Sequence, residues 1–158
     1  MKHKLLQSLM LIAALLTCTH AYAHDFEAQN SDGVTIYYNI TSSTDKTCEV
    51  TFRGSYSTFY SNEYTGSIVL PETVTYNGTT YSVTTIGDSA FYGCRDLTSI
   101  VIPNSVISIG SLAFVSCSGL TSILVESGNA VYDSRDNCNA IIETSTNTLI
   151  AGCKNTTF

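Results

Sequence analysis

The chain has 158 residues, of which seven are basic and thirteen acidic, and its formal net charge is −6 at neutral pH. An acidic surface repels phosphate backbones, which argues against a nucleic acid as partner. No run of apolar residues reaches the roughly 20 that a membrane-spanning helix needs, which argues against a membrane span.

The N-terminal segment has the three regions of a secretory signal peptide. Lys2 and Lys4 make a basic start, residues 5–18 are mostly apolar, and residues 21–23 (Ala-Tyr-Ala) fit the small-x-small rule for cleavage. We therefore expect residues 1–23 to be a signal peptide and the mature protein to be secreted or held at the cell surface. Cleavage removes two of the seven basic residues. The mature chain then has five basic and thirteen acidic residues, so its net charge is −8.

Two other interpretations of this segment are weaker. Cys18 could mark a lipoprotein anchor, but Thr17 stands where a small residue is usual, so we expect no anchor of that kind. A buried N-terminal helix would account for the apolar run, but for neither the basic start nor the cleavage site.

Residues 24–63 are predicted to form an N-terminal β cap. Residues 34–40 alternate between apolar and polar at period two, and Cys48, Val50 and Phe52 continue that alternation after a turn. Two such runs predict a β-hairpin. Its expected role is to cover the open apolar end of the repeats that follow.

Residues 64–126 are predicted to be a repeat array. A 23-residue unit that begins at Ile86 recurs at Ile109, with Gly, Ala-Phe, Cys and Leu-Thr-Ser-Ile in the same places. Such a period indicates a solenoid, in which each unit buries its apolar face against its neighbours. A partial first copy lies around Ile68, and its insert contains Asn77-Gly78, the dipeptide typical of a two-residue hairpin turn. We interpret this insert as structural decoration rather than a functional protrusion.

Each full copy carries the Leu-x-x-Leu-x-Leu spacing of a leucine-rich repeat strand. Side chains alternate along a strand, and the short stretch before it is expected to be one helical or 3₁₀ turn that carries Ala-Phe inward. The predicted repeat core comprises Ile86, Phe91, Cys94, Leu97, Ile100 and Ile102, with Ile109, Phe114, Cys117, Leu120, Ile123 and Val125.

Residues 127–158 are predicted to form a C-terminal β-hairpin and an incomplete last repeat. Two β-forming runs, residues 140–144 and 148–151, flank a turn at residues 145–147. Either the two hairpins cap the array, or the chain is a truncated member with an exposed C-terminal strand edge that invites pairing. We favour truncation slightly.

The repeated string Ile-Gly-x-x-Ala-Phe-x-x-Cys-x-x-Leu-Thr-Ser-Ile resembles the BspA-like (Treponema pallidum type) leucine-rich repeat family. The flanking residues 64–71, 81–87, 132–144 and 147–153 also resemble segments of that family. The expected fold is therefore mainly β, a short leucine-rich-repeat solenoid with an N-terminal β-hairpin cap and a C-terminal β-hairpin. The resemblance implies a secreted or surface-displayed bacterial protein that binds host proteins or other cells, and it carries over no catalytic residue.

A solenoid presents surfaces rather than a reaction chamber, so we expect a non-enzymatic, adhesin-like binding protein. Expected partners are extracellular or host proteins, or other repeat proteins. The alternatives are a truncated or capping fragment that self-associates through its C-terminal edge and, least favoured, a secreted hydrolase. The candidate ligand-binding residues point outward from the repeat strands: Thr98, Ser99, Val101, Thr121, Ser122 and Leu124.

The outward pair Val101 and Leu124 would form a small apolar stripe on a polar sheet. Two surface apolar residues also need no functional explanation, because much of any protein surface is apolar. Both interpretations stay open at this point.

The sequence offers little catalytic or metal-binding chemistry, and we expect no cofactor. His24 would be the single histidine left after cleavage, so a Ser-His or Cys-His pair has no base. The mature chain lacks a Cys-x-x-Cys pattern, so no metal site is expected. Residues 133–137 fit a turn better than a calcium loop, since the loop's glycine and terminal glutamate are missing.

Five cysteines remain after cleavage, an odd number that leaves at least one thiol unpaired. Cys94 and Cys117 hold equivalent repeat positions and should stack one rung apart, where parallel Cβ vectors do not suit a disulfide. We expect them to be buried thiols. Cys138 and Cys153 could pair across the C-terminal hairpin, although burial is the safer interpretation.

Overall fold

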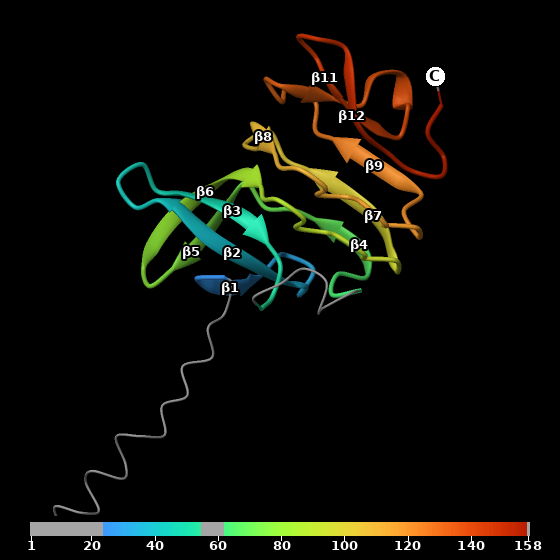
Figure 1. Cartoon of the computed structure of the whole chain (residues 1–158). Coiled ribbons are helices and arrows are strands. Elements are labelled where there is room, and N and C mark those ends of the chain that lie inside the picture. Colours follow the sequence, from blue (N-terminus) through green and yellow to red (C-terminus); the bar gives the residue numbers. More distant parts are fainter. Residues whose placement is uncertain (1–23, 55–61, 158) are drawn as a thin grey trace, which may run out of the picture.

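The computed structural model describes residues 24–54 and 62–157. The expected signal peptide and most of the expected loop after Phe52 lie outside these residues. Figure 1 shows the chain passing from a β unit at one end, through stacked strands, to a smaller β unit at the other. The described chain consists of twelve β-strands and one 3₁₀ helix, so the predicted mainly β solenoid is confirmed. Across these same residues, no helix is long and apolar enough to cross a membrane.

Three antiparallel strands form the N-terminal unit: β1 (Phe26–Gln29), β2 (Thr35–Ser42) and β3 (Thr47–Thr51). The β2–β3 hairpin is confirmed, whereas β1 was not predicted. The alternation ends one residue earlier than expected. Thr51 is buried at 4% exposure and Phe52 is only half-buried, because the Thr51 carbonyl accepts a buried hydrogen bond from Tyr64.

The N-terminal unit is joined to the repeats through β3. This strand runs parallel to β6 (Thr79–Ile86), and the N–H of Gly87 donates to the carbonyl of Val50 at 2.8 Å. The buried Asn30 makes a second link, because its Nδ2 donates to the carbonyl of Val69 at 3.0 Å. The cap therefore supplies a rung of backbone pairing as well as apolar cover.

The insert in the first repeat is the predicted hairpin. It consists of β5 (Thr73–Tyr76) and the first part of β6, joined by Asn77 and Gly78. Both turn residues have positive φ, 48° and 76°, as a type I′ turn requires.

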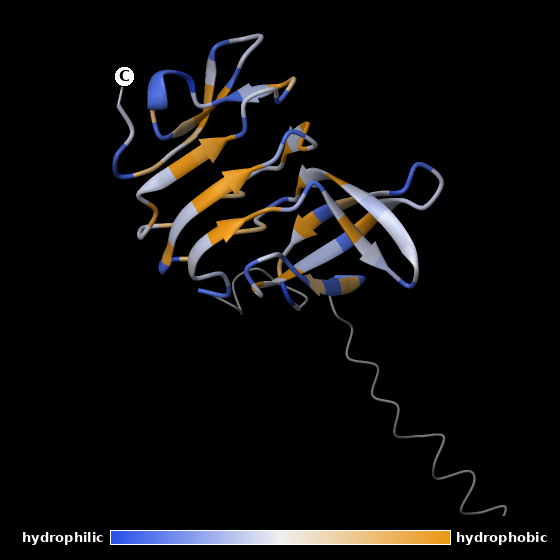
Figure 2. Ribbon diagram, turned by 180° about the vertical axis from the view of Figure 1, so that it is seen from behind, coloured by the Kyte–Doolittle hydropathy of each residue, from blue (hydrophilic) through white to orange (hydrophobic). Residues whose placement is uncertain are grey.

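The repeat strands β4 (Gly66–Val69), β7 (Leu97–Ile102) and β9 (Ser122–Val125) form a parallel sheet in that order. Figure 2 shows apolar residues gathered along these three strands. On a second side of the solenoid, the end of β6 pairs in parallel with the short strand β8 (Ser108–Ile109). The partial first copy is thus a true rung, with Ile68 in register with Ile100.

The stretch before each repeat strand is a series of turns, not the single helical turn that the sequence suggested. Positive φ at Ser89 (56°) and at its equivalent Leu112 (59°) prevents a continuous helix. Between the two copies, these turns are joined by a ladder of backbone hydrogen bonds at 2.9 Å: Ser89 N to Ser111 O, Phe91 N to Ala113 O and Gly93 N to Val115 O.

An aromatic column runs through the repeats beside this ladder. The ring of Tyr64 lies 4.8 Å from that of Phe91, and Phe91 stacks on Phe114 at 5.3 Å with an interplanar angle of 3°. The Tyr64 hydroxyl donates to the Thr51 carbonyl at 2.7 Å and accepts from the Tyr37 N–H at 3.1 Å. Tyr64 therefore fastens the column to the N-terminal unit.

The two copies differ in how completely their apolar residues are covered. All six core positions of the first copy, from Ile86 to Ile102, are at most 1% exposed. In the second copy Leu120, Ile123 and Val125 are buried. Three further positions are only partly buried as they pack against the core: Ile109, Phe114 and Cys117.

The C-terminal unit is an antiparallel sheet of β10 (Tyr132–Asp133), β11 (Ala140–Glu143) and β12 (Thr148–Gly152), with the 3₁₀ helix η1 (Arg135–Asn137) between its first two strands. The predicted β11–β12 hairpin is confirmed. Two bonds tie this unit to β9 and its approach: the N–H of Lys154 donates to Leu120 O, and the N–H of Val125 donates to Ser134 Oγ, both at 3.0 Å.

The aromatic column yields a paired stability prediction. Phe91→Ala empties a site enclosed on both sides and should lower the free energy of unfolding by about 3–5 kcal/mol. Phe114→Ala removes a ring that is only partly buried and should lower the free energy of unfolding by less, about 2 kcal/mol. Urea unfolding of both variants measures the difference. Equal losses of unfolding free energy would contradict the observation that Phe114 is less completely covered than Phe91.

Candidate binding surface

The outer face of the β4–β7–β9 sheet carries two rows of side chains in register. One is a hydroxyl row, in which Ser99 of β7 pairs with Ser67 on one side and Ser122 on the other. The other is an aliphatic row, in which Val101 pairs in the same way with Val69 and Leu124. We call these six residues the two-row face.

Two residues of the two-row face are exposed, and both lie on the outer strands of this sheet. Leu124 on the edge strand β9 is 47% exposed, and Ser67 on the edge strand β4 is also exposed. Val101 on the central strand is half-buried, because neighbouring parallel strands lie only about 4.8 Å apart. The rows are therefore continuous, with their most accessible apolar atoms at Leu124.

Four of the six predicted binding residues, Ser99, Val101, Ser122 and Leu124, lie on the two-row face. The other two, Thr98 and Thr121, lie beside it at the start of the strands. A register shift between Gly66 and Ser67 leaves Thr98 without a partner on β4, and Thr98 is exposed. The Thr121 hydroxyl donates to the Thr98 carbonyl at 3.0 Å, so its proton is already used within the sheet.

Leu124 also lines a hollow at the end of β9. This cavity of about 710 Å³ lies between β9 and the C-terminal unit, and its other walls include Asn104, Glu126, Tyr132 and Arg135. It is large enough to take several side chains of a partner. The structure thus extends the aliphatic row into a hollow with polar walls.

An ion pair fixes one wall of this hollow. The Arg135 Nη2 lies 2.6 Å from Asp133 Oδ2, while its Nη1 donates to Asn147 Oδ1 at 2.7 Å. Hydrogen bonds from Arg135 lower the pKa of the Asp133 carboxyl to about 2. The N–H of Arg135 also donates to Asp133 Oδ1 at 3.1 Å, so the predicted turn is present.

Sequence reasoning missed Ser67 and Val69. Both lie in the partial first copy, and aligning its Ile68 with Ile100 would have placed them opposite Ser99 and Val101. The hollow at the end of β9 left no comparable signal, because it depends on how the C-terminal unit packs against that strand.

No metal or thiol chemistry is assembled on this face. Among residues 24–54 and 62–157, no three or more His, Cys, Asp or Glu side chains cluster so as to hold a metal ion. All five cysteines in these ranges are free thiols. Three of them donate to carbonyls: Cys117 Sγ to Phe91 O at 3.0 Å, Cys153 Sγ to Asn139 O at 3.2 Å and Cys48 Sγ to Ser82 O at 3.6 Å.

Burial raises the pKa of three thiols, one in the N-terminal unit and two in the repeats. It raises the pKa of Cys48 and of Cys117 to about 12, and it also raises the pKa of Cys94. A buried thiolate is costly in an apolar setting, so these groups stay protonated where an unfolded thiol ionises.

The thiols therefore predict a loss of stability at alkaline pH. Between about pH 9 and pH 12 the unfolded chain releases thiol protons that the folded chain retains, so the free energy of unfolding falls as pH rises. Thermal unfolding from pH 8 to pH 11 should show a shallower decline for the Cys48→Ala/Cys117→Ala variant than for the unchanged chain. If both proteins lost stability equally steeply over this pH range, these thiols would not contribute to the loss.

Comparison with known proteins agrees with this architecture. A sequence model of the family described as "BspA type Leucine rich repeat region (6 copies)" matches residues 55–156, which confirms the resemblance drawn from the repeated motif. No curated protein matches the chain.

Several solved structures of bacterial leucine-rich repeat proteins are similar. One from Bacteroides ovatus has 33% identity and a TM-score of 0.51 over 66% of this chain and 24% of its own. One from Bacteroides capillosus has 30% identity and a TM-score of 0.48 over 63% and 65%. A leucine-rich cell surface protein from Faecalibacterium prausnitzii has 26% identity and a TM-score of 0.47 over 65% and 24%. The chain thus spans about a quarter of the length of the Bacteroides ovatus protein and about a quarter of the length of the Faecalibacterium prausnitzii protein.

Proposed function

Because the chain belongs to the BspA-type leucine-rich repeat family, we propose that it is a secreted or cell-surface protein that binds other proteins through the two-row face. The family supports a protein-binding role in general. The observation that carries the choice of surface is the register of Val69, Val101 and Leu124 beside a matching row of serines.

The two-row face offers a protein partner both apolar and hydrogen-bonding side chains. Protein interfaces combine an apolar centre with a polar surround that supplies about one hydrogen bond per 100–200 Å². Here the aliphatic row supplies the apolar centre, and the serine row supplies hydroxyls that both donate and accept. The sheet is an extended surface rather than an enclosed cavity, which favours a macromolecular partner over a small ligand.

The lack of charge on the two-row face favours binding through close packing rather than through long-range electrostatic attraction. All six residues of the two-row face are uncharged, and the nearby Arg135 is paired with Asp133. Binding through this face should therefore depend little on ionic strength, since screening acts on exposed charges. This fits an adhesin-like role toward extracellular or host proteins, and no catalytic step is proposed.

Leu124→Asp tests the two-row face. A carboxylate in the aliphatic row should weaken binding to immobilised extracellular matrix proteins, or to intact host cells, by about tenfold or more. The fold should persist, because Leu124 is 47% exposed. Ile107→Asp is the matched control, since Ile107 is 55% exposed and lies outside the two-row face. Surface plasmon resonance with both variants measures the effect, and equal binding by the two would rule out this face.

Removal of residues 1–23 during secretion can be tested separately. Expression in a bacterium with an intact export pathway should yield extracytoplasmic protein whose N-terminus is His24, because residues 21–23 fit the cleavage rule. Intact-protein mass spectrometry identifies that terminus. A chain that keeps Met1, or that begins at a lipid-modified Cys18, would contradict the proposed processing.

A further inference from the structure

The second repeat copy presents an unused hydrogen-bonding edge. Inside the molecule, the first copy donates from Ser89, Phe91 and Gly93 to carbonyls of the second copy. The 23-residue offset makes Leu112, Phe114 and Ser116 the equivalent donors of the second copy. Across residues 24–54 and 62–157, none of these three N–H groups finds an acceptor.

The backbone of the second copy is already shaped for this bonding. Leu112 has φ 59° where Ser89 has 56°, and Ser116 has φ 63° where Gly93 has 71°. Non-glycine residues rarely adopt such angles, so their recurrence shows that both turns share one conformation. The three donors are therefore arrayed as they are in the first copy.

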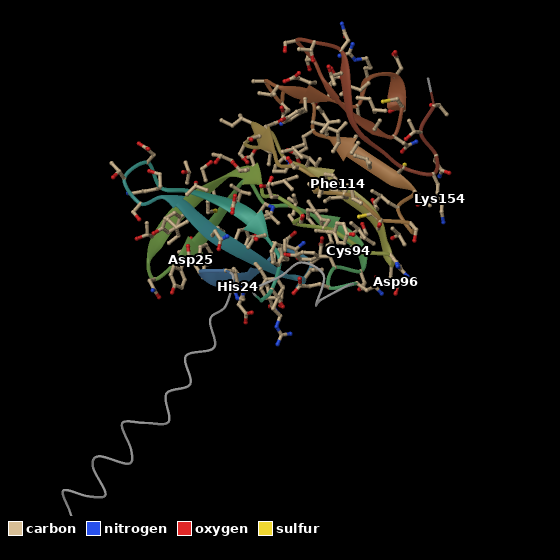
Figure 3. All side chains as sticks on the ribbon, viewed as in Figure 1. His24, Asp25, Cys94, Asp96, Phe114 and Lys154 are labelled. Atoms are coloured by element: carbon tan, nitrogen blue, oxygen red, sulfur yellow. The ribbon has the colours of Figure 1, made fainter. Side chains whose placement is uncertain are left out.

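A groove lined by uncharged residues lies beside these donors. It is a cavity of about 230 Å³ between the turn of the second copy and β12, and none of its lining residues is charged. Leu112 is 59% exposed, Val115 41% and Ile150 39%, and Phe114 is half-buried between them. Figure 3 labels Phe114 near the boundary between the repeat strands and the C-terminal unit. The groove is smaller than the roughly 300 Å³ of typical small-ligand pockets and suits one or two side chains.

We propose that this groove binds a repeat turn of the same class, Ile-Gly-x-x-Ala-Phe, supplied by a different BspA-type polypeptide. The back of such a turn presents the complementary groups. In this chain the back of the second copy offers the carbonyls of Ser111, Ala113 and Val115 and one face of the Phe114 ring. The incoming turn thus continues an interface that already exists between the two copies.

A second copy of this chain fits the groove less well. Its own first repeat is closed on the back by Tyr64, which is 1% exposed and packs against Phe91 at 4.8 Å. Two grooves placed face to face would set N–H donors against N–H donors and leave them unsatisfied, which is costly. The acidic net charge also disfavours association of identical chains.

A synthetic peptide of residues 107–119, labelled with a fluorophore, serves as the incoming turn. Titration of the mature chain should show saturable binding by fluorescence anisotropy. A peptide with Phe114→Ala should bind about tenfold more weakly, because it loses the stacked ring. Leu112→Asn in the protein should have a similar effect, and asparagine tolerates the positive φ at this position. Ile107→Asn in the protein is the matched control and should leave the affinity unchanged.

Nuclear magnetic resonance locates the contact independently of affinity. The peptide should shift the amide signals of Leu112, Phe114 and Ser116, and the signals of the two-row face should stay in place. Absence of saturable binding and of these shifts at millimolar peptide would overturn the proposal. So would a homodimer that forms without peptide and is lost in Leu112→Asn, since the second copy would then occupy the groove. Neither result depends on whether the two-row face binds a partner.

Discussion

The structure depends on one constraint: no repeat of this solenoid can cover its own apolar face, so each must be covered by the next. The aromatic column makes this constraint visible. Tyr64, Phe91 and Phe114 follow one another at ring distances of 4.8 and 5.3 Å, close to the rung spacing of about 4.8 Å set by parallel strands. The column begins at a fully buried tyrosine bonded to the cap and ends at a partly buried phenylalanine. On the turn side, the described repeats are therefore closed at one end and open at the other, whereas the C-terminal unit covers the strand side of the second copy.

Features that depend on local pattern could be predicted from the sequence. The 23-residue offset placed Phe91 and Phe114 on equivalent positions, and Asn77-Gly78 predicted its hairpin because both residues need positive φ. The parallel pairing of β3 with β6 could not be predicted in this way. It joins segments far apart in the chain, and nothing in their alternation distinguishes a parallel partner from an antiparallel one. The anchoring role of Tyr64 was missed for the same reason, since its partners come from two different strands.

The candidate surfaces also combine features that local sequence pattern predicts with features that it does not predict. The outward set on β7 and β9 follows from alternation alone, whereas its extension to Val69 requires aligning an interrupted copy. The N–H donors at the open edge of the second copy depend on a positive φ at Leu112, which leucine rarely adopts. The residue type therefore could not predict this edge. The chain presents two faces with different chemistry: an uncharged pair of rows on the sheet, and a short row of N–H donors beside a groove of uncharged residues.

Residue-resolved amide hydrogen exchange on the free mature chain tests the central claim, that the repeats are closed at one end and open at the other. The N–H of Phe91 donates to Ala113 within the ladder and should exchange slowly, near the rate of global unfolding. The equivalent N–H of Phe114 should exchange orders of magnitude faster, because it lacks an acceptor in the described structure. Equal protection of these two amides would show that the second copy is covered like the first, and would contradict the account.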